Sequence, residues 1–407
     1  MGTGCTPAPA APPAEAPAAP PAEAPAAPPT EAPAAPPAEA PAAPPTEAPA
    51  APPAEAPAAF DPVAALSALE GQVFSTGPRG ETPTAASEVA LSEEDLAKIK
   101  EMKAKAAIVL HYAGNDWSSA QVAGLKSQFE KMGVEVVAVT DAGFKPEKQV
   151  SDIETVLAMK PNIIVSIPTD PVATASAYKS AADAGVKLVF MDNVPNEVEQ
   201  GKDYVSVVSA DNYGNGIAAA HLMAKSINGE GKIGVIYHEA DFFVTKQRYQ
   251  AFTKTIKDNY PAIEIVEEQG ITGPDFAGDA EKAASAMMTK HSDLKGIWAV
   301  WDVPAEGVMA AARAMGRDKD LVITTIDLGL NVAVEIAKDG MVKGLGAQRP
   351  FDQGVTEAIL AGYGLLGKEA PAYVALYMLP VDKNNVLEAW KTVYHSDPPA
   401  DLVNAAK

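Results

Sequence analysis

The chain has 407 residues, of which 53 are acidic and 32 basic, and its formal net charge is −21. This charge disfavours nucleic-acid binding, because proteins hold DNA and RNA phosphates with clustered lysine and arginine side chains. No apolar run approaches the roughly 18 residues that a membrane-spanning helix needs. We therefore expect no nucleic-acid partner and no helix that crosses a membrane.

The only cysteine, Cys5, lies directly before a long segment of proline and small residues. A single cysteine excludes a disulfide within the chain. A cysteine that follows small residues near the amino terminus is typical of a bacterial lipoprotein, in which it carries the lipid. We predict that Cys5 anchors the protein to the extracytoplasmic side of the cell membrane; a chance surface thiol is the alternative.

Residues 6–59 contain only Pro, Ala, Glu and Thr, with a glutamate recurring every eighth position from Glu15 to Glu55. Proline-rich chains with regularly spaced like charges extend and cannot bury a core. We predict a disordered linker over residues 1–59. Residues 60–105 follow as a transitional segment whose capped helix after Ser92 is peripheral. Both segments are expected to be dispensable for the fold and for ligand affinity.

From residue 106 onward, apolar runs alternate with helical patterns, which is typical of parallel βαβ units. Asp170-Pro171 is predicted to start a helix, because aspartate caps helices and proline suits the first helical position. The alternation restarts near residue 232, which predicts two sheets with separate cores. The predicted strands are 107–110, 135–139, 162–167, 187–191 and 204–208, then 232–237, 263–267, 296–300, 321–326 and 342–346, followed by helix 352–366, strand 374–379 and helix 386–393.

Short polar motifs follow many of these strands or begin the next helix. They are Asn115-Asp116-Trp117, Ile167-Pro168-Thr169-Asp170, Phe190-Met191-Asp192-Asn193, Ser209-Ala210-Asp211-Asn212, Lys246-Gln247-Arg248, Ile326-Asp327 and Gly346-Ala347-Gln348. In order and spacing they resemble the ribose-binding branch of the type I periplasmic binding proteins over residues 106–393.

The resemblance implies an α/β fold of two doubly wound, Rossmann-like lobes joined by a hinge of three chain crossings. The lobes would comprise residues 106–210 plus 348–378 and residues 211–347 plus 379–407. The implied function is that of a monomeric solute-binding protein of an ABC importer. It would close around a neutral monosaccharide, an aldopentose or aldohexose such as ribose, xylose or glucose, and deliver it to a permease with its ATPase.

The resemblance also suggests the site residues. Planar polar groups bind sugar hydroxyls in pairs, and flat rings cover the C–H faces of a sugar. Open parallel sheets bind ligands beyond the carboxyl ends of their strands, which is where most of the motifs lie. Carried over are Asn115, Asp192, Asp327 and Gln348 as hydroxyl ligands and Trp117 and Phe276 as rings; the further candidates are Asp116, Asn193, Lys246, Arg248, Trp301 and Asp302.

Three of these positions depart from the branch. It usually has arginine at the positions of Asn193 and Lys246 and asparagine at that of Trp301, so the ligand need not be ribose. An aspartate at a strand end often only caps the next helix. We favour this structural role for Asp170, Asp211 and Asp302.

No motif supports an enzyme or a cofactor. Gly362, Gly364 and Gly367 match the GxGxxG dinucleotide pattern but end a predicted helix instead of starting one. The five histidines lack the spacing of metal ligands, and a lone histidine is more often structural. We predict a non-enzymatic protein without cofactor or metal. A sensory module that reports a sugar, polyol or furanose-type signal to a chemoreceptor or receptor kinase is the alternative.

Overall fold

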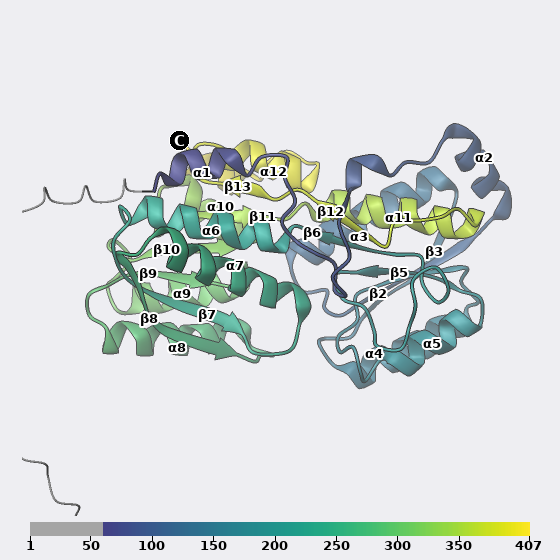
Figure 1. Ribbon diagram of the computed structural model, residues 1–407, viewed down its shortest axis with the longest axis horizontal. Coiled ribbons are helices and arrows are strands. Elements are labelled where there is room, and N and C mark those ends of the chain that lie inside the picture. Colours follow the sequence, from purple (N-terminus) through teal and green to yellow (C-terminus); the bar gives the residue numbers. More distant parts are fainter. Residues whose placement is uncertain (1–59) are drawn as a thin grey trace, which may run out of the picture. The chain divides into compact units, whose positions relative to one another are not determined.

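The computed structural model describes residues 60–407, so Cys5 and the repeat segment lie outside the described residues. Two largely parallel sheets with helices packed on their faces form two lobes (Figure 1). In residues 60–407 no helix combines the length and the apolar character that a membrane crossing requires.

The first lobe is built on a seven-stranded, wholly parallel sheet. Residues of one strand alternate between two cores: Ala106 and Ile108 belong to one cluster, Ala107 and Val109 to the other. Because helices cover both faces, the strands are almost continuously apolar. The sheet order is β1 (Thr84–Ala85), β12 (Tyr373–Leu376), β6 (Ser206–Ala210), β5 (Lys187–Met191), β4 (Ile163–Ser166), β2 (Lys105–Leu110) and β3 (Glu135–Asp141), and the helices are α2 (Glu93–Met102), α3 (Asp116–Met132), α4 (Pro146–Ala158), α5 (Ala175–Asp183) and α11 (Pro350–Leu366).

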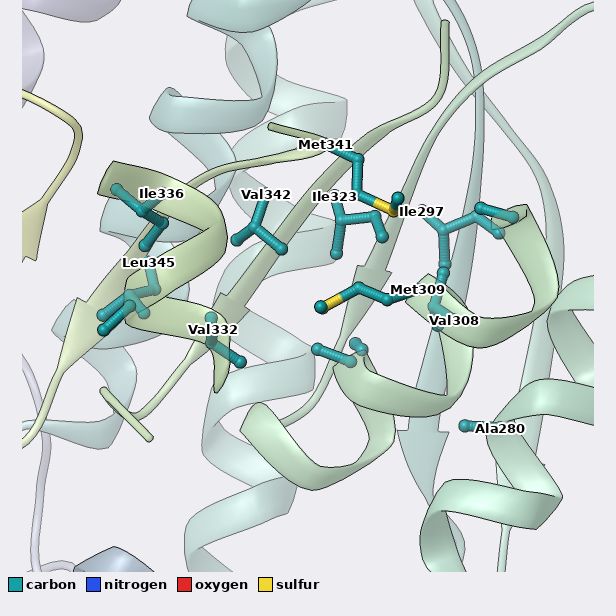
Figure 2. Close-up of a cluster of buried hydrophobic side chains, with 14 of the residues drawn as sticks. Ala280, Ile297, Val308, Met309, Ile323, Val332, Ile336, Met341, Val342 and Leu345 are labelled. Carbon is teal, nitrogen blue, oxygen red and sulfur yellow. The ribbon is translucent and has the colours of Figure 1, made fainter. Parts of the chain in front are cut away.

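The second lobe repeats this architecture with six strands, of which only the edge strand β13 is antiparallel to its neighbour. Figure 2 shows part of its core, where Ile297, Ile323 and Val342 from three adjacent strands pack against helical residues such as Val308 and Val332. The sheet order is β13 (Leu379–Val381), β11 (Val342–Ala347), β10 (Val322–Ile326), β9 (Leu294–Ala299), β7 (Gly231–His238) and β8 (Ile263–Ile271), and the helices are α6 (Asn212–Ser226), α7 (Phe243–Asn259), α8 (Phe276–Lys290), α9 (Asp302–Ala314), α10 (Leu330–Ala337), α12 (Val386–Tyr394) and α13 (Ala400–Ala405).

Two local predictions were wrong. The strand expected over 374–379 is two strands, because β12 ends in the first lobe and the chain then crosses to pair β13 with β11. The helix expected at Asp170 begins only at Ala175. The Asp170 carboxylate instead accepts the backbone N–H groups of Val172 and Ala173, which stabilises a turn before the helix.

Within residues 60–407 the chain crosses between the lobes four times. Three crossings, after β6, β11 and β12, are those that the resemblance implied. The fourth is at the amino-terminal end, where α1 (Pro62–Ala68) packs against α6 of the second lobe and β1 pairs with β12 of the first. The connecting residues 69–83 therefore run alongside the hinge.

This fourth crossing is bound to the hinge through Asp211. The Asp211 carboxylate accepts N–H groups from Phe74, Ser75 and Gly214 and the Ser75 hydroxyl, all at 2.8–2.9 Å. Asp211 is fully buried, so these donors replace water around it. The expectation that residues 60–105 are dispensable is therefore wrong for the fold: they supply an edge strand and most of the donors to a buried carboxylate.

Truncation tests this role. Removing residues 1–59 is expected to leave the unfolding free energy unchanged. Removing residues 1–81 should lower it by about 3 kcal/mol or more, because Asp211 loses three of its hydrogen-bond donors. Ser75→Ala should cost about 1–2 kcal/mol for the same reason. Urea denaturation provides the measurement and exposed Ser67→Ala the control. Equal stability of the two truncated chains would contradict the structural role of the segment.

Candidate ligand-binding site

A cavity of about 230 Å³ lies between the lobes. Its walls come from loops and helix starts at the carboxyl ends of strands of both sheets, where parallel α/β folds bind ligands. The lining residues are His111, Tyr112, Asn115, Trp117, Phe144, Ile167 and Asp192 from the first lobe, and His238, Phe242, Val244, Thr245, Arg248, Pro274, Asp275, Phe276, Ala277, Trp301, Val303, Asp327 and Gln348 from the second.

An ion pair between Arg248 and Asp327 forms the polar floor on the second lobe. Their Nη1 and Oδ2 atoms are 3.2 Å apart, and both residues are more than nine-tenths buried. The other Asp327 oxygen accepts the Gln348 amide at 2.6 Å. A buried charge is stable only when it is paired and hydrogen-bonded, and here the hydrogen bonds also fix the orientation of all three side chains.

Asp192 holds the corresponding position on the first lobe. Asp192 follows β5 and Asp327 follows β10, and both have left-handed backbone conformations, with φ of 57° and 71°. The Asp192 carboxylate accepts the Ser209 hydroxyl at 2.6 Å. Burial raises the pKa of Asp192 to about 6, although the hydrogen bond from Ser209 and the charge of Arg248 act in the opposite direction.

A hydrogen-bond chain joins these two acids through the first crossing. Arg248 Nε donates to the Asn212 amide oxygen at 2.8 Å, and the Asn212 nitrogen donates to Ser209 Oγ at 3.0 Å. Ser209 in turn donates to Asp192. One buried hydrogen-bond network therefore fixes the positions of Asp192 and Asp327 relative to each other.

Two histidines in the cavity wall are neutral. Burial lowers the pKa of His111 to about 3, with a smaller effect from the charge of His238. Burial likewise lowers the pKa of His238 to about 4, helped by the charge of Arg248. Near neutral pH both rings therefore act as uncharged aromatic surfaces with one donor and one acceptor each.

Aromatic rings from the two lobes meet across the cavity. Phe144 lies edge to face with Phe276, with centroids 5.3 Å apart, and His111 stacks on Phe242 at 5.9 Å. Phe276 also contacts Trp301 at 4.9 Å. Sugar C–H faces and other flat groups bind to such surfaces.

Three buried polar atoms of the lining have no hydrogen-bond partner among residues 60–407. They are His111 Nδ1, Trp117 Nε1 and Gln348 Oε1. Leaving a buried polar atom unpaired costs about 1–3 kcal/mol.

The structure brings eight of the predicted site residues into the lining of this cavity and places four elsewhere. The eight are Asn115, Trp117, Asp192, Arg248, Phe276, Trp301, Asp327 and Gln348. Asn115 also caps α3, through a bond from the Ser118 N–H to its amide oxygen.

The other four, which were predicted as ligand-binding residues, do not line this cavity. Asn193 and Lys246 lie on a separate cavity; the Asn193 amide donates to Pro168 O, and the Lys246 ammonium lies 3.5 Å from Asp241. Asp302 is buried behind the wall, where burial and the nearby Asp327 raise its pKa well above the usual range.

Asp116, the fourth, points away from the cavity and joins the lobes. Its carboxylate accepts the backbone N–H of Leu330, at the start of α10 in the second lobe, at 2.9 Å. This bond exists only while the two lobes are close together. Asp116 therefore holds the lobes together and does not line the cavity.

Sequence reasoning missed the rings His111, Tyr112, Phe144, His238 and Phe242. They carry the same signal as Asp192, because each ends or closely follows β2, β3 or β7. The histidines were set aside because they lack metal-ligand spacing. That argument concerns metal coordination and does not bear on ring stacking.

In sequence, the chain is similar to sugar-binding proteins of two bacteria. The ribose import binding protein of Bacillus subtilis is 28% identical over 230 residues, which cover 56% of this chain and 70% of the relative. The D-ribose/D-allose-binding protein of Pseudomonas aeruginosa is 26% identical, covering 67% and 85%.

Among solved structures, an Agrobacterium vitis ABC transporter solute-binding protein bound to α-D-tagatopyranose has a TM-score of 0.66 at 23% identity, covering 72% of this chain and 99% of that one. This likeness supports the fold. Residues 106–369, well over half of the chain, match the periplasmic binding protein domain, and the chain therefore belongs to that family.

Proposed function

We propose that this protein is the extracytoplasmic solute-binding component of an ABC sugar importer and holds one neutral sugar between its lobes. The observation that carries the proposal is the pair Asp192 and Asp327, one from each lobe, facing one cavity together with Arg248 and Gln348. Paired acceptors and donors of this kind suit vicinal hydroxyls, which donate and accept. The relatives named as ribose-binding proteins support the same ligand class.

Membrane attachment through Cys5 belongs to this proposal. It agrees with the extracytoplasmic location of import binding proteins, and it leaves the two lobes free to meet a permease. Mass spectrometry of Cys5 in the protein isolated from membranes is the test. An unmodified thiol would contradict the anchor without affecting the sugar site.

A thermal-shift screen of pentoses, hexoses and polyols tests the function. A sugar at about 100 times its dissociation constant should stabilise the protein by about 2.7 kcal/mol, and NMR should show it unchanged after incubation. Asp327→Asn should then weaken calorimetric affinity about 10- to 100-fold, because charge-assisted hydrogen bonds are worth about 1.5–3 kcal/mol.

Asp339→Asn is the matched control for this variant. Asp339 also has a left-handed backbone, with φ of 57°, but it is exposed and outside the cavity. Its affinity should equal that of the wild type. The sugar assignment fails if no member of the panel shifts the melting temperature.

Affinity should also depend on pH through Asp192. Its ionised form accepts hydroxyl protons, and with a pKa of about 6 only about a tenth of the molecules are ionised at pH 5. Affinity should therefore fall about tenfold from pH 7.5 to pH 5. The pKa of about 6 already includes the effects of the neighbouring charges of Arg248 and Asp327. The pKa values of His111 and His238 lie below pH 5, so these rings stay neutral between pH 5 and pH 7.5. The Asp192→Asn variant should bind the sugar weakly, with an affinity that does not change between pH 5 and pH 7.5. If the affinity of this variant still fell at low pH, another group would be responsible for the pH dependence.

We further propose that the lobes close around the sugar at the crossings near Asp211, Gln348 and Pro380. Ligand groups on both lobes can be satisfied together only when the lobes are close, so the sugar favours the closed form. The Asp116 to Leu330 bond supports a closed state with direct contacts between lobes. X-ray scattering on residues 60–407 should show a smaller radius of gyration with saturating sugar. Asp116→Ala should reduce the fraction closed, and an unchanged scattering profile on binding would refute closure.

A further inference from the structure

Strand order divides the cavity into two unlike halves. In the first lobe β5 lies nearer the crossings than β2 and β3, and in the second lobe β11 and β10 lie nearer than β7 and β8. The near strands end in Asp192, Asp327 and Gln348. We call the part of the cavity lined by these three residues the hinge half. The far strands end in rings, and we call that side, with Tyr112, Phe144, His238 and Phe276, the outer half.

The outer half offers mostly flat, uncharged surface. Tyr112 stacks on Phe144 with centroids 5.1 Å apart, and His238 lies 5.5 Å from Phe276. His238 is neutral because burial lowers its pKa to about 4. The one carboxylate there, Asp275, is exposed and already accepts the Gly278 N–H at 3.0 Å as the cap of α8.

A free sugar matches the hinge half better than the outer half. Its hydroxyls project around the whole ring, and a hydroxyl buried against aromatic carbon without a partner is unfavourable. The rings exceed what two sugar faces need, since His111, Phe144, Phe276 and Trp301 form one continuous contact series. The hydroxyl partners of the outer half are few and uncharged: the Asn115 amide, the Tyr112 hydroxyl and the His238 ring.

Two lining residues of the first lobe each carry one buried polar atom without a hydrogen-bond partner among residues 60–407. The atoms are His111 Nδ1 and Trp117 Nε1. Each can make one hydrogen bond, and neither carries charge at neutral pH. Neither atom therefore adds a charge or an exposed hydroxyl partner to the cavity.

We propose that the physiological ligand is a glycoside, a sugar whose anomeric carbon bears an uncharged flat or apolar group. The proposal rests on the sugar-binding function above and names its substrate class. The sugar hydroxyls lie in the hinge half, against Asp192, Asp327 and Gln348. The substituent lies against the aromatic surface that Phe144 and Phe276 form in the outer half. A nucleobase and an aryl group share this chemistry.

The test compares matched ligands by calorimetry on residues 60–407. The pairs are ribose with adenosine and uridine, and glucose with methyl and phenyl glucosides of both anomers. Stacking of a flat ring on aromatic side chains changes affinity by about 5- to 150-fold. We expect at least one ring-bearing glycoside to bind with that advantage over its parent sugar and over the methyl glycoside. A nucleoside preference and an aryl glucoside preference identify the two possible sources.

Variants separate the two halves. Phe144→Ala should lower the ratio of glycoside to parent-sugar affinity at least fivefold. Asp327→Asn should weaken both ligands and leave the ratio near its wild-type value. Tyr249→Ala is the control, because Tyr249 is a partly buried ring outside the cavity, paired with Tyr237.

The outcomes distinguish this inference from the function on which it rests. Tight binding of a free sugar with weaker or equal binding of every glycoside overturns the glycoside proposal and leaves the sugar-binding function in place. Binding of neither class overturns both. A wild-type ratio in Phe144→Ala, with a preferred glycoside, would also overturn the placement of the substituent.

Discussion

The buried ion pair between Arg248 and Asp327 is the interaction on which the site depends. An unpaired guanidinium at this depth would be strongly unfavourable, so Arg248 is satisfied by Asp327, by the Asn212 amide and by Val300 O. Through Asn212 and Ser209 the same network reaches Asp192. Two acids that come from different sheets are therefore fixed relative to each other by a chain of hydrogen bonds that passes through a crossing. Rotation of the lobes must strain or rearrange this chain, which couples the site to the hinge.

The parallel direction of the strands explains why the site has two chemical halves. The carboxyl ends of all parallel strands lie at the same edge of a sheet. Residues that follow neighbouring strands are therefore neighbours in the cavity wall, in the order of the strands. Near the crossings the wall is anchored by the network around Asp327. Toward the far strands no such anchor exists, and rings such as Phe144 and Phe276 cover the gap between the lobes. Apolar contacts need no fixed hydrogen-bond geometry. The ring contacts between the lobes can therefore break and form again when the lobes separate and close.

The amino-terminal segment adds a constraint on that motion. Residues 74–75 bind Asp211 at the first crossing, Gln247 of the second lobe donates to Thr76 O, and Arg79 donates to Pro195 and Val198 carbonyls of the first lobe. The segment thus contacts both lobes and the hinge between them. The residues that precede the alternating strands and helices are therefore part of the hinge region.

The sequence by itself determined the alternation of strands and helices, the division into two modules and the strand-end positions of Asp192, Asp327 and Gln348. These follow from local patterns: apolar runs, caps and short motifs. Three features were decided only by the tertiary structure. The chain crosses to the second lobe before β13, residues 74–75 donate hydrogen bonds to Asp211, and Asp116 and Asp302 do not line the cavity. Each of these depends on which groups become neighbours across more than 30 positions of sequence. The rings of the outer half were present in the sequence as ordinary apolar residues, and their role appears only where two sheets bring their edges together.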